Sequence, residues 1–131
     1  MKKMLFVFAL VSFIGFQTYA INAPKNVTAL KQSSVVSLLE GVKSENSGLR
    51  AGSAYLLGEF QAEDAVLPLM DLFNTSTVRG ERIAAALALT KIGDSRGVKV
   101  IEFAAKHDAD PIVRDLCEKF YKSLMTGNSV N

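Results

Sequence analysis

Cys117 and His107 are the side chains of this sequence best suited to nucleophilic or metal chemistry. They lie ten residues apart, and no third side chain is placed to orient the histidine as a base. The nearest carboxylates, Asp108 and Asp110, are better explained as loop and helix-capping residues than as metal ligands. The sequence also lacks a phosphate-binding glycine loop, paired cysteines and a nucleophile elbow. We therefore expect no catalytic residue, metal or cofactor.

Both residues have simpler structural interpretations. Cys117 is expected to be a small buried hydrophobic residue on a helix, with a reactive thiol or an intermolecular disulfide as alternatives. His107 is expected to place a cation near a helix C-terminus, where the helix dipole favours it.

Arg50, Arg82 and Arg114 recur at a spacing of 32 residues. Such a row of guanidinium groups could bind a partner. It could also reach loop carbonyls or an Asp of the neighbouring repeat and tie the repeats together. We favour the second interpretation and assign the three arginines, with Asp94 and Asp110, as structural inter-repeat residues.

Helical signals extend from residue 33 to residue 125, without the alternating pattern of a strand. Asp94 and Asp110 are expected N-caps, Pro111 fits the first position of a helix, and Gly127 follows the last one. These signals predict six helices, at residues 34–43, 48–60, 63–74, 78–92, 94–107 and 110–125.

The same 32-residue offset aligns the apolar positions of these helices. Ala54 matches Ala86, and Leu57 matches Leu89 and Tyr121. Two helices per period predict an all-α fold, a short α-solenoid of about six helices. The helix at 78–92 is apolar nearly all round and should be enclosed by its neighbours. The first and last helices are apolar on one side only, so they should cap the two ends of a stack that stays monomeric. The first is expected to bury Val35, Val36, Leu38, Leu39 and Val42.

The N-terminal residues have the three-part layout of a secretory signal peptide. Lys2 and Lys3 precede an apolar run over residues 4–16, and Ala20 ends a cleavage-site pattern. We expect residues 1–20 to be cleaved after Ala20, with an uncleaved anchor as the alternative. The layout is typical of bacterial export, to the periplasm or outside the cell. Residues 21–32 are expected to form a flexible leader and residues 126–131 a polar tail.

Cleavage would also change the charge of the chain. Without Lys2 and Lys3, 13 Lys and Arg residues face 13 Asp and Glu residues. A neutral chain without a basic run argues against nucleic acid and against an anionic membrane surface as partners.

The second repeat carries a recognisable family pattern: Ala85, Ala86, Ala88, Leu89, Ile92, Gly93, Asp94 and Val98. The last helix begins in the same style, with Asp110, Pro111, Val113 and Arg114. From about residue 33 to 124 the chain resembles HEAT repeats, in particular the short bacterial HEAT-like repeats of the phycobilisome-lyase type. Gln61 and Ala62 depart from the pattern where Gly-Asp is usual, as does Glu118 where Ala is usual.

The resemblance implies a scaffold that recognises another protein along the second helices of its repeats. Iron-binding hydroxylase relatives use repeated His-Glu pairs, which this sequence lacks. With Val66, Leu69, Phe73, Val98, Ile101 and Ala105 inward, the expected partner-binding residues are Asp71, Asn74, Lys99, Glu102 and Lys106. An enzyme or enzyme accessory that uses the groove as a substrate cleft, and a structural part of an envelope complex, remain alternatives.

Overall fold

The computed structural model describes residues 27–127 of the 131-residue chain. The predicted signal peptide, its cleavage site and residues 21–26 and 128–131 lie outside this range. Residues 31–131 form one compact unit, and the contacts given below lie within it. The described residues form α2 (Val27–Gly41), α3 (Ser47–Glu59), the 3-10 helix η1 (Glu63–Ala65), α4 (Val66–Thr75), α5 (Arg79–Ile92), α6 (Ser95–His107) and α7 (Pro111–Thr126).

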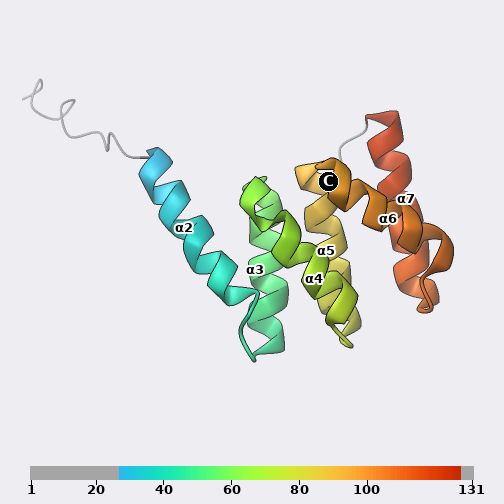
Figure 1. The fold of residues 1–131 in the computed structure, drawn as a ribbon, viewed down its shortest axis with the longest axis horizontal. Helices are drawn as coiled ribbons and strands as arrows, with labels where there is room; N and C mark the ends of the chain where they lie inside the picture. The colour runs from blue at the N-terminus through green and yellow to red at the C-terminus, as the bar shows by residue number, and fades with distance from the viewer. Residues whose placement is uncertain (1–26, 128–131) are drawn as a thin grey trace, which may run out of the picture. The chain divides into compact units, whose positions relative to one another are not determined.

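The helices pack as consecutive pairs (Figure 1). The first helices of the pairs, α3, α5 and α7, contact one another in that order, and the second helices α4 and α6 also contact each other. Each second helix packs against the first helix that follows it, α4 on α5 and α6 on α7. This arrangement confirms the predicted all-α solenoid with two helices per 32-residue period.

Most helix ends match their sequence signals. The Asp94 carboxylate accepts a hydrogen bond from the Arg96 amide at 2.9 Å, and the Asp110 carboxylate accepts one from the Ile112 amide at 2.9 Å. Gly93 and Gly127 end α5 and α7 in the left-handed conformation, with φ of 72° and 68°. The sequence Ile-Gly-Asp is therefore a helix stop followed by a helix start, not a site of chemistry.

The first helix differs from its prediction in two respects. α2 begins at Val27, so the predicted flexible leader is wrong for residues 27–32, which contain no glycine or proline to interrupt a helix. Val36 was expected to be buried, but 54% of it is exposed. Val35 and Val42 lie seven residues apart on one helix face, and a residue next to Val35 points about 100° away from that face.

The core is centred on α5, which contacts α3, α4, α6 and α7. Ala85, Ala86, Ala88 and Leu89 are buried there, as the sequence predicted for an enclosed helix. α3 approaches α5 so closely that a Cβ added at Gly58 would lie 2.6 Å from the Ala88 Cα atom. Glycine is therefore required at this crossing.

The second helices turn most of the predicted apolar residues inward. Val66, Leu69, Phe73 and Ile101 are buried. The inward face of α6 is rotated slightly from its prediction, because Ala104 is buried while Val98 and Ala105 are half-buried. This rotation determines which side of α6 faces α4.

Candidate functional site: the groove between α4 and α6

The three periodic arginines each donate to a carbonyl that precedes their own helix. Arg50 Nη1 lies 2.6 Å from the Ser44 carbonyl oxygen, and Arg82 Nε lies 3.0 Å from that of Phe73. Arg114 Nη1 lies 2.9 Å from the carbonyl oxygen of Asp108. Each arginine therefore holds the connection that leads into a first helix.

Two of these arginines also bind a carboxylate of the next repeat. Arg50 donates to both carboxylate oxygens of Glu81, at 2.9 and 2.6 Å, and Arg82 binds both oxygens of Asp108. The planar guanidinium suits this two-point contact. The hydrogen bond from Arg50 is the largest cause that lowers the pKa of Glu81, to about 2. Burial works against ionisation of Asp108, but its hydrogen bonds to Arg82 and to the Asp110 amide lower its pKa overall.

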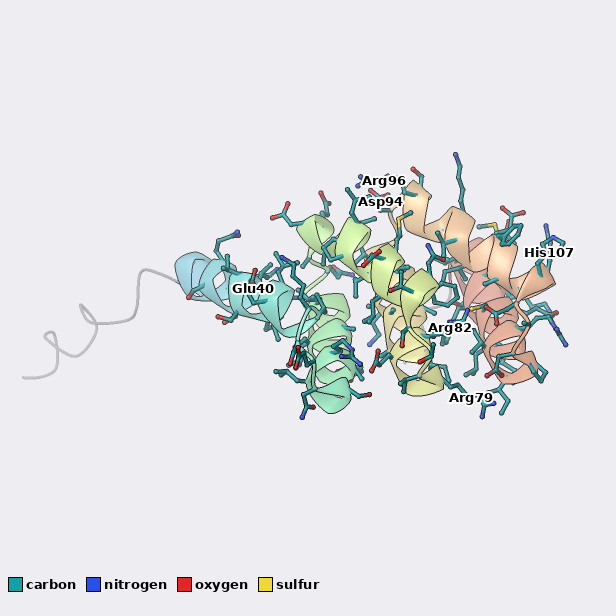
Figure 2. The ribbon with its side chains drawn as sticks, turned by 60° about the horizontal axis from the view of Figure 1, so that its bottom comes forward. Glu40, Arg79, Arg82, Asp94, Arg96 and His107 are labelled. Atoms are coloured by element: carbon teal, nitrogen blue, oxygen red, sulfur yellow. The ribbon has the colours of Figure 1, made fainter. Side chains whose placement is uncertain are left out.

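The other residues assigned to inter-repeat contacts have different roles. Asp110 caps α7 and also accepts from Arg79 Nε at 2.6 Å, so it joins α5 to α7. Asp94 does not link repeats, because its carboxylate caps α6 and pairs with Arg96 of the same helix, 2.9 Å away (Figure 2). Arg114 lies on α7, the last of the first helices, and no carboxylate pairs with it among the described residues.

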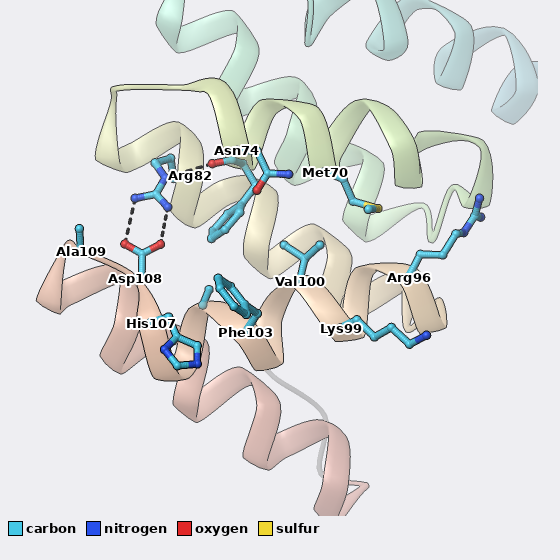
Figure 3. A pocket seen from close by; sticks show the side chains of 12 residues that line it. Met70, Asn74, Arg82, Arg96, Lys99, Val100, Phe103, His107, Asp108 and Ala109 are labelled. Atoms are coloured by element: carbon cyan, nitrogen blue, oxygen red, sulfur yellow. Dashed lines mark hydrogen bonds and ion pairs between the residues drawn. The ribbon is translucent and has the colours of Figure 1, made fainter.

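A groove of about 630 Å³ opens between α4 and α6 (Figure 3). We call it the α4–α6 groove. Met70 and Phe73 of α4 and Val100 and Phe103 of α6 supply its apolar surface. The remaining lining residues are polar, charged or small: Asn74, Arg82, Arg96, Lys99, Ala104, His107, Asp108 and Ala109.

The groove separates the five predicted partner-binding residues. Asn74 and Lys99 line it, whereas Asp71 lines a second cavity of about 540 Å³ on the other side of α4. Glu102 and Lys106 line neither cavity and pair with each other at 3.0 Å. The predicted residues therefore do not all line one cavity.

Sequence reasoning missed Phe103, which is the most exposed large apolar side chain in the groove. It is 67% exposed, and its ring centroid lies 4.6 Å from that of His107. The spacing of Arg96, Val100, Phe103 and His107, at intervals of four, three and four residues, is a helical face that could have been found from the sequence.

The two groups considered for chemistry do not form a catalytic or metal centre. Cys117 is fully buried, and burial raises the pKa of its thiol to about 12, so the reactive thiolate is suppressed. Within residues 27–127, no three His, Cys, Asp or Glu side chains are grouped as metal ligands would be. No helix in the same range is long and apolar enough to span a bilayer.

Comparison with known protein families matches residues 35–119 to HEAT repeats. The chain belongs to the HEAT repeat family. No curated protein matches the chain. HEAT repeats generally act as protein–protein interaction scaffolds and are typically not catalytic. In this HEAT repeat protein, the contacts of Arg50, Arg82 and Arg114 explain why these arginines recur at the repeat period. The α4–α6 groove is one of two cavities described here, and it is the one that Phe103 lines.

Proposed function

We propose that the protein is an exported, non-enzymatic interaction module that binds a segment of another protein in the α4–α6 groove. The observation that carries this proposal is the exposure of Phe103 beside an apolar groove of about 630 Å³. Soluble proteins rarely leave large aromatic side chains exposed along a concave apolar surface without a binding role. The carboxylate that lines the groove, Asp108, is already bound by Arg82, which favours recognition over acid–base catalysis.

Burial of Phe103 by a partner would contribute on the order of 1–2 kcal/mol, because part of a full phenylalanine burial of about 1.5–3 kcal/mol is already realised in the free protein. We therefore expect Phe103→Ser to weaken binding roughly tenfold. The substitution should leave folding intact, because the side chain is mostly outside the core.

The test is selection of peptides from a random displayed library against the purified protein, followed by fluorescence anisotropy with the selected peptides. Met125→Ser is the matched control, because Met125 is 60% exposed on α7 and does not line the groove. Peptides that lose affinity for the Phe103 variant but not for the Met125 variant support the proposal. Equal binding to the Phe103 variant, or a library that yields no binder, would reject it.

Export rests on the N-terminal residues. Lys2 and Lys3, the apolar run over residues 4–16 and Ala20 together support a bacterial signal peptide and a periplasmic or secreted protein. The polar outer faces of the first and last helices support a monomer. Expression of the full chain in a bacterial host should give a soluble exported form whose N-terminal residue is Ile21. An intact N-terminus on a membrane-bound chain would instead support the uncleaved anchor.

A further inference from the structure

We infer that the segment bound in the α4–α6 groove is extended and acidic, with a carboxylate that pairs with Lys99 next to an apolar side chain that packs on Phe103. This inference rests on the proposed function and specifies its partner.

Lys99 carries the unpaired positive charge of the groove. Arg82 is bound by Asp108 and Arg96 by Asp94, so these two guanidinium groups already have carboxylate partners. The Lys99 side chain is exposed and makes no hydrogen bond or ion pair within residues 27–127. Asp108 is the one carboxylate among the lining residues of the groove, and it is not free. A partner with a negative charge is therefore favoured, and one with a positive charge is repelled.

The position of the charged groups fixes where the carboxylate would lie. Lys99 and Arg96 are at one end of the groove, and Arg82, Asp108 and His107 are at the other (Figure 3). Val100 and Phe103 lie between the two ends. A segment whose carboxylate reaches Lys99 would therefore place its next side chains over the apolar part of the groove.

The dimensions of the groove fit an extended segment. The lining residues of α6 run from Arg96 to His107, which at 1.5 Å per residue is about 17 Å. About five or six residues of extended chain cover this length. Asn74 lies on the opposite wall, and its side chain is exposed and has no hydrogen-bond partner in the described part of the chain. Its carboxamide can therefore both donate to and accept from a peptide unit.

The second cavity is the equivalent groove of the preceding repeat. Subtracting 32 from the numbers of the twelve residues that line the α4–α6 groove gives twelve positions, and eight of them line the second cavity: Val42, Arg50, Pro68, Asp71, Leu72, Thr75, Ser76 and Thr77. Pro68, Asp71 and Thr75 stand there in place of Val100, Phe103 and His107. The fold thus forms both grooves, and the side chains make one of them apolar with a free cation. This contrast supports binding of an acidic, apolar segment in the α4–α6 groove alone.

The test is fluorescence anisotropy with labelled peptides of about eight residues, each with a central Leu or Phe, in three series that flank it with Glu, Gln or Lys. The wild-type protein should bind the Glu series roughly five- to tenfold more tightly than the Lys series, with a difference that shrinks as salt is added. Lys99→Glu should reverse that order. Lys106→Glu is the matched control, because Lys106 is an exposed lysine on the same helix outside the groove, and it should keep the order of the wild type.

The outcomes separate this inference from the proposed function. Binding that depends on Phe103 but is the same for the Glu, Gln and Lys series would overturn the inference and leave the proposed function standing. A preference for the Lys series, or an equal effect of Lys99→Glu and Lys106→Glu, would also overturn it. Failure of all three series, together with a random library that yields no binder, would reject both.

Discussion

The contact between Arg50 and Glu81 gives the sharpest prediction about stability. Glu81 is only 1% exposed, and its carboxylate accepts from Arg50 Nε at 2.9 Å, from Arg50 Nη2 at 2.6 Å and from Ser76 Oγ at 2.6 Å. Glu81→Gln keeps the shape but replaces one acceptor oxygen with an NH₂ group that faces other donors. It also leaves the Arg50 guanidinium without its counter-ion.

Two estimates of the cost agree. Removal of one partner from a fully buried ion pair costs about 3–5 kcal/mol, and Arg50, which is 23% exposed, can recover part of this by hydration. The pKa of Glu81 is lowered from 4.5 to about 2, which corresponds to roughly 3 kcal/mol of stability at neutral pH. We therefore expect Glu81→Gln to lower the free energy of unfolding by about 2–3 kcal/mol.

The pH dependence has a definite sign. The carboxylate of Glu81 titrates at a lower pH in the folded chain than in the unfolded chain, so its contribution is fully present above about pH 4.5. It is lost as the pH falls toward 2. The wild-type protein should therefore lose stability over this window, and the Gln variant should lose less because it lacks the group.

Urea unfolding followed by far-UV circular dichroism, repeated between pH 7 and the lowest pH at which both proteins fold, measures both effects. Glu63→Gln is the control, because the Glu63 side chain is exposed and makes no hydrogen bond or ion pair within the described residues, so its change should stay within about 0.5 kcal/mol. If Glu81→Gln lowers the free energy of unfolding at pH 7 by no more than Glu63→Gln does, the Arg50–Glu81 ion pair does not have the predicted effect on stability. The predicted pH dependence is wrong if the free energies of unfolding of the wild type and the Gln variant fall in parallel below pH 4.5.

Four further predictions test the packing of the helices, a left-handed backbone position and the burial of the thiol. Gly58→Ala should lower the free energy of unfolding by about 1–3 kcal/mol, because the new Cβ meets Ala88. Gly52→Ala on the same helix, with nothing within 4 Å of the new Cβ, should raise it by about 0.5–1 kcal/mol. Gln61 has a φ of 49°, a left-handed conformation that is costly for every residue except glycine. Gln61→Gly should therefore raise the free energy of unfolding by about 1 kcal/mol, as measured by thermal unfolding. The Cys117 thiol should react with iodoacetamide only after denaturant unfolds the protein, as mass spectrometry would show.

The architecture could be predicted from the sequence because its signals repeat. The N-caps Asp94 and Asp110 and the cap Gly93 act within a few residues of chain, so local reasoning finds them. The left-handed turn at Gln61 was harder to predict, since glycine is absent there, although Gln61 stands 32 residues before the left-handed Gly93. The start of α2 was also misplaced, because a helix without a capping signal can extend through any residues that tolerate it.

The site was harder to predict because it depends on how two helices face each other. The inward residues of α6 were assigned from their alignment with α4, and a modest rotation moved Ala104 into the core in place of Ala105. The same rotation turned Phe103 toward α4 and moved Glu102 out of the groove. Periodicity predicts which residues share a helix face, but the crossing of the helices decides what that face meets.

The comparison of the two grooves indicates where function lies in a repeated fold. Residues that recur at the 32-residue period, such as Arg50 and Arg82, make the same type of contact in each repeat and hold the stack together. Phe103 replaces Asp71 and Lys99 replaces Leu67 at equivalent positions, although the backbone does not require either change. Stability alone would gain nothing from an aromatic ring that is 67% exposed or from a lysine without a partner. The departures from the repeat, rather than the repeat itself, therefore mark the surface that a partner would recognise.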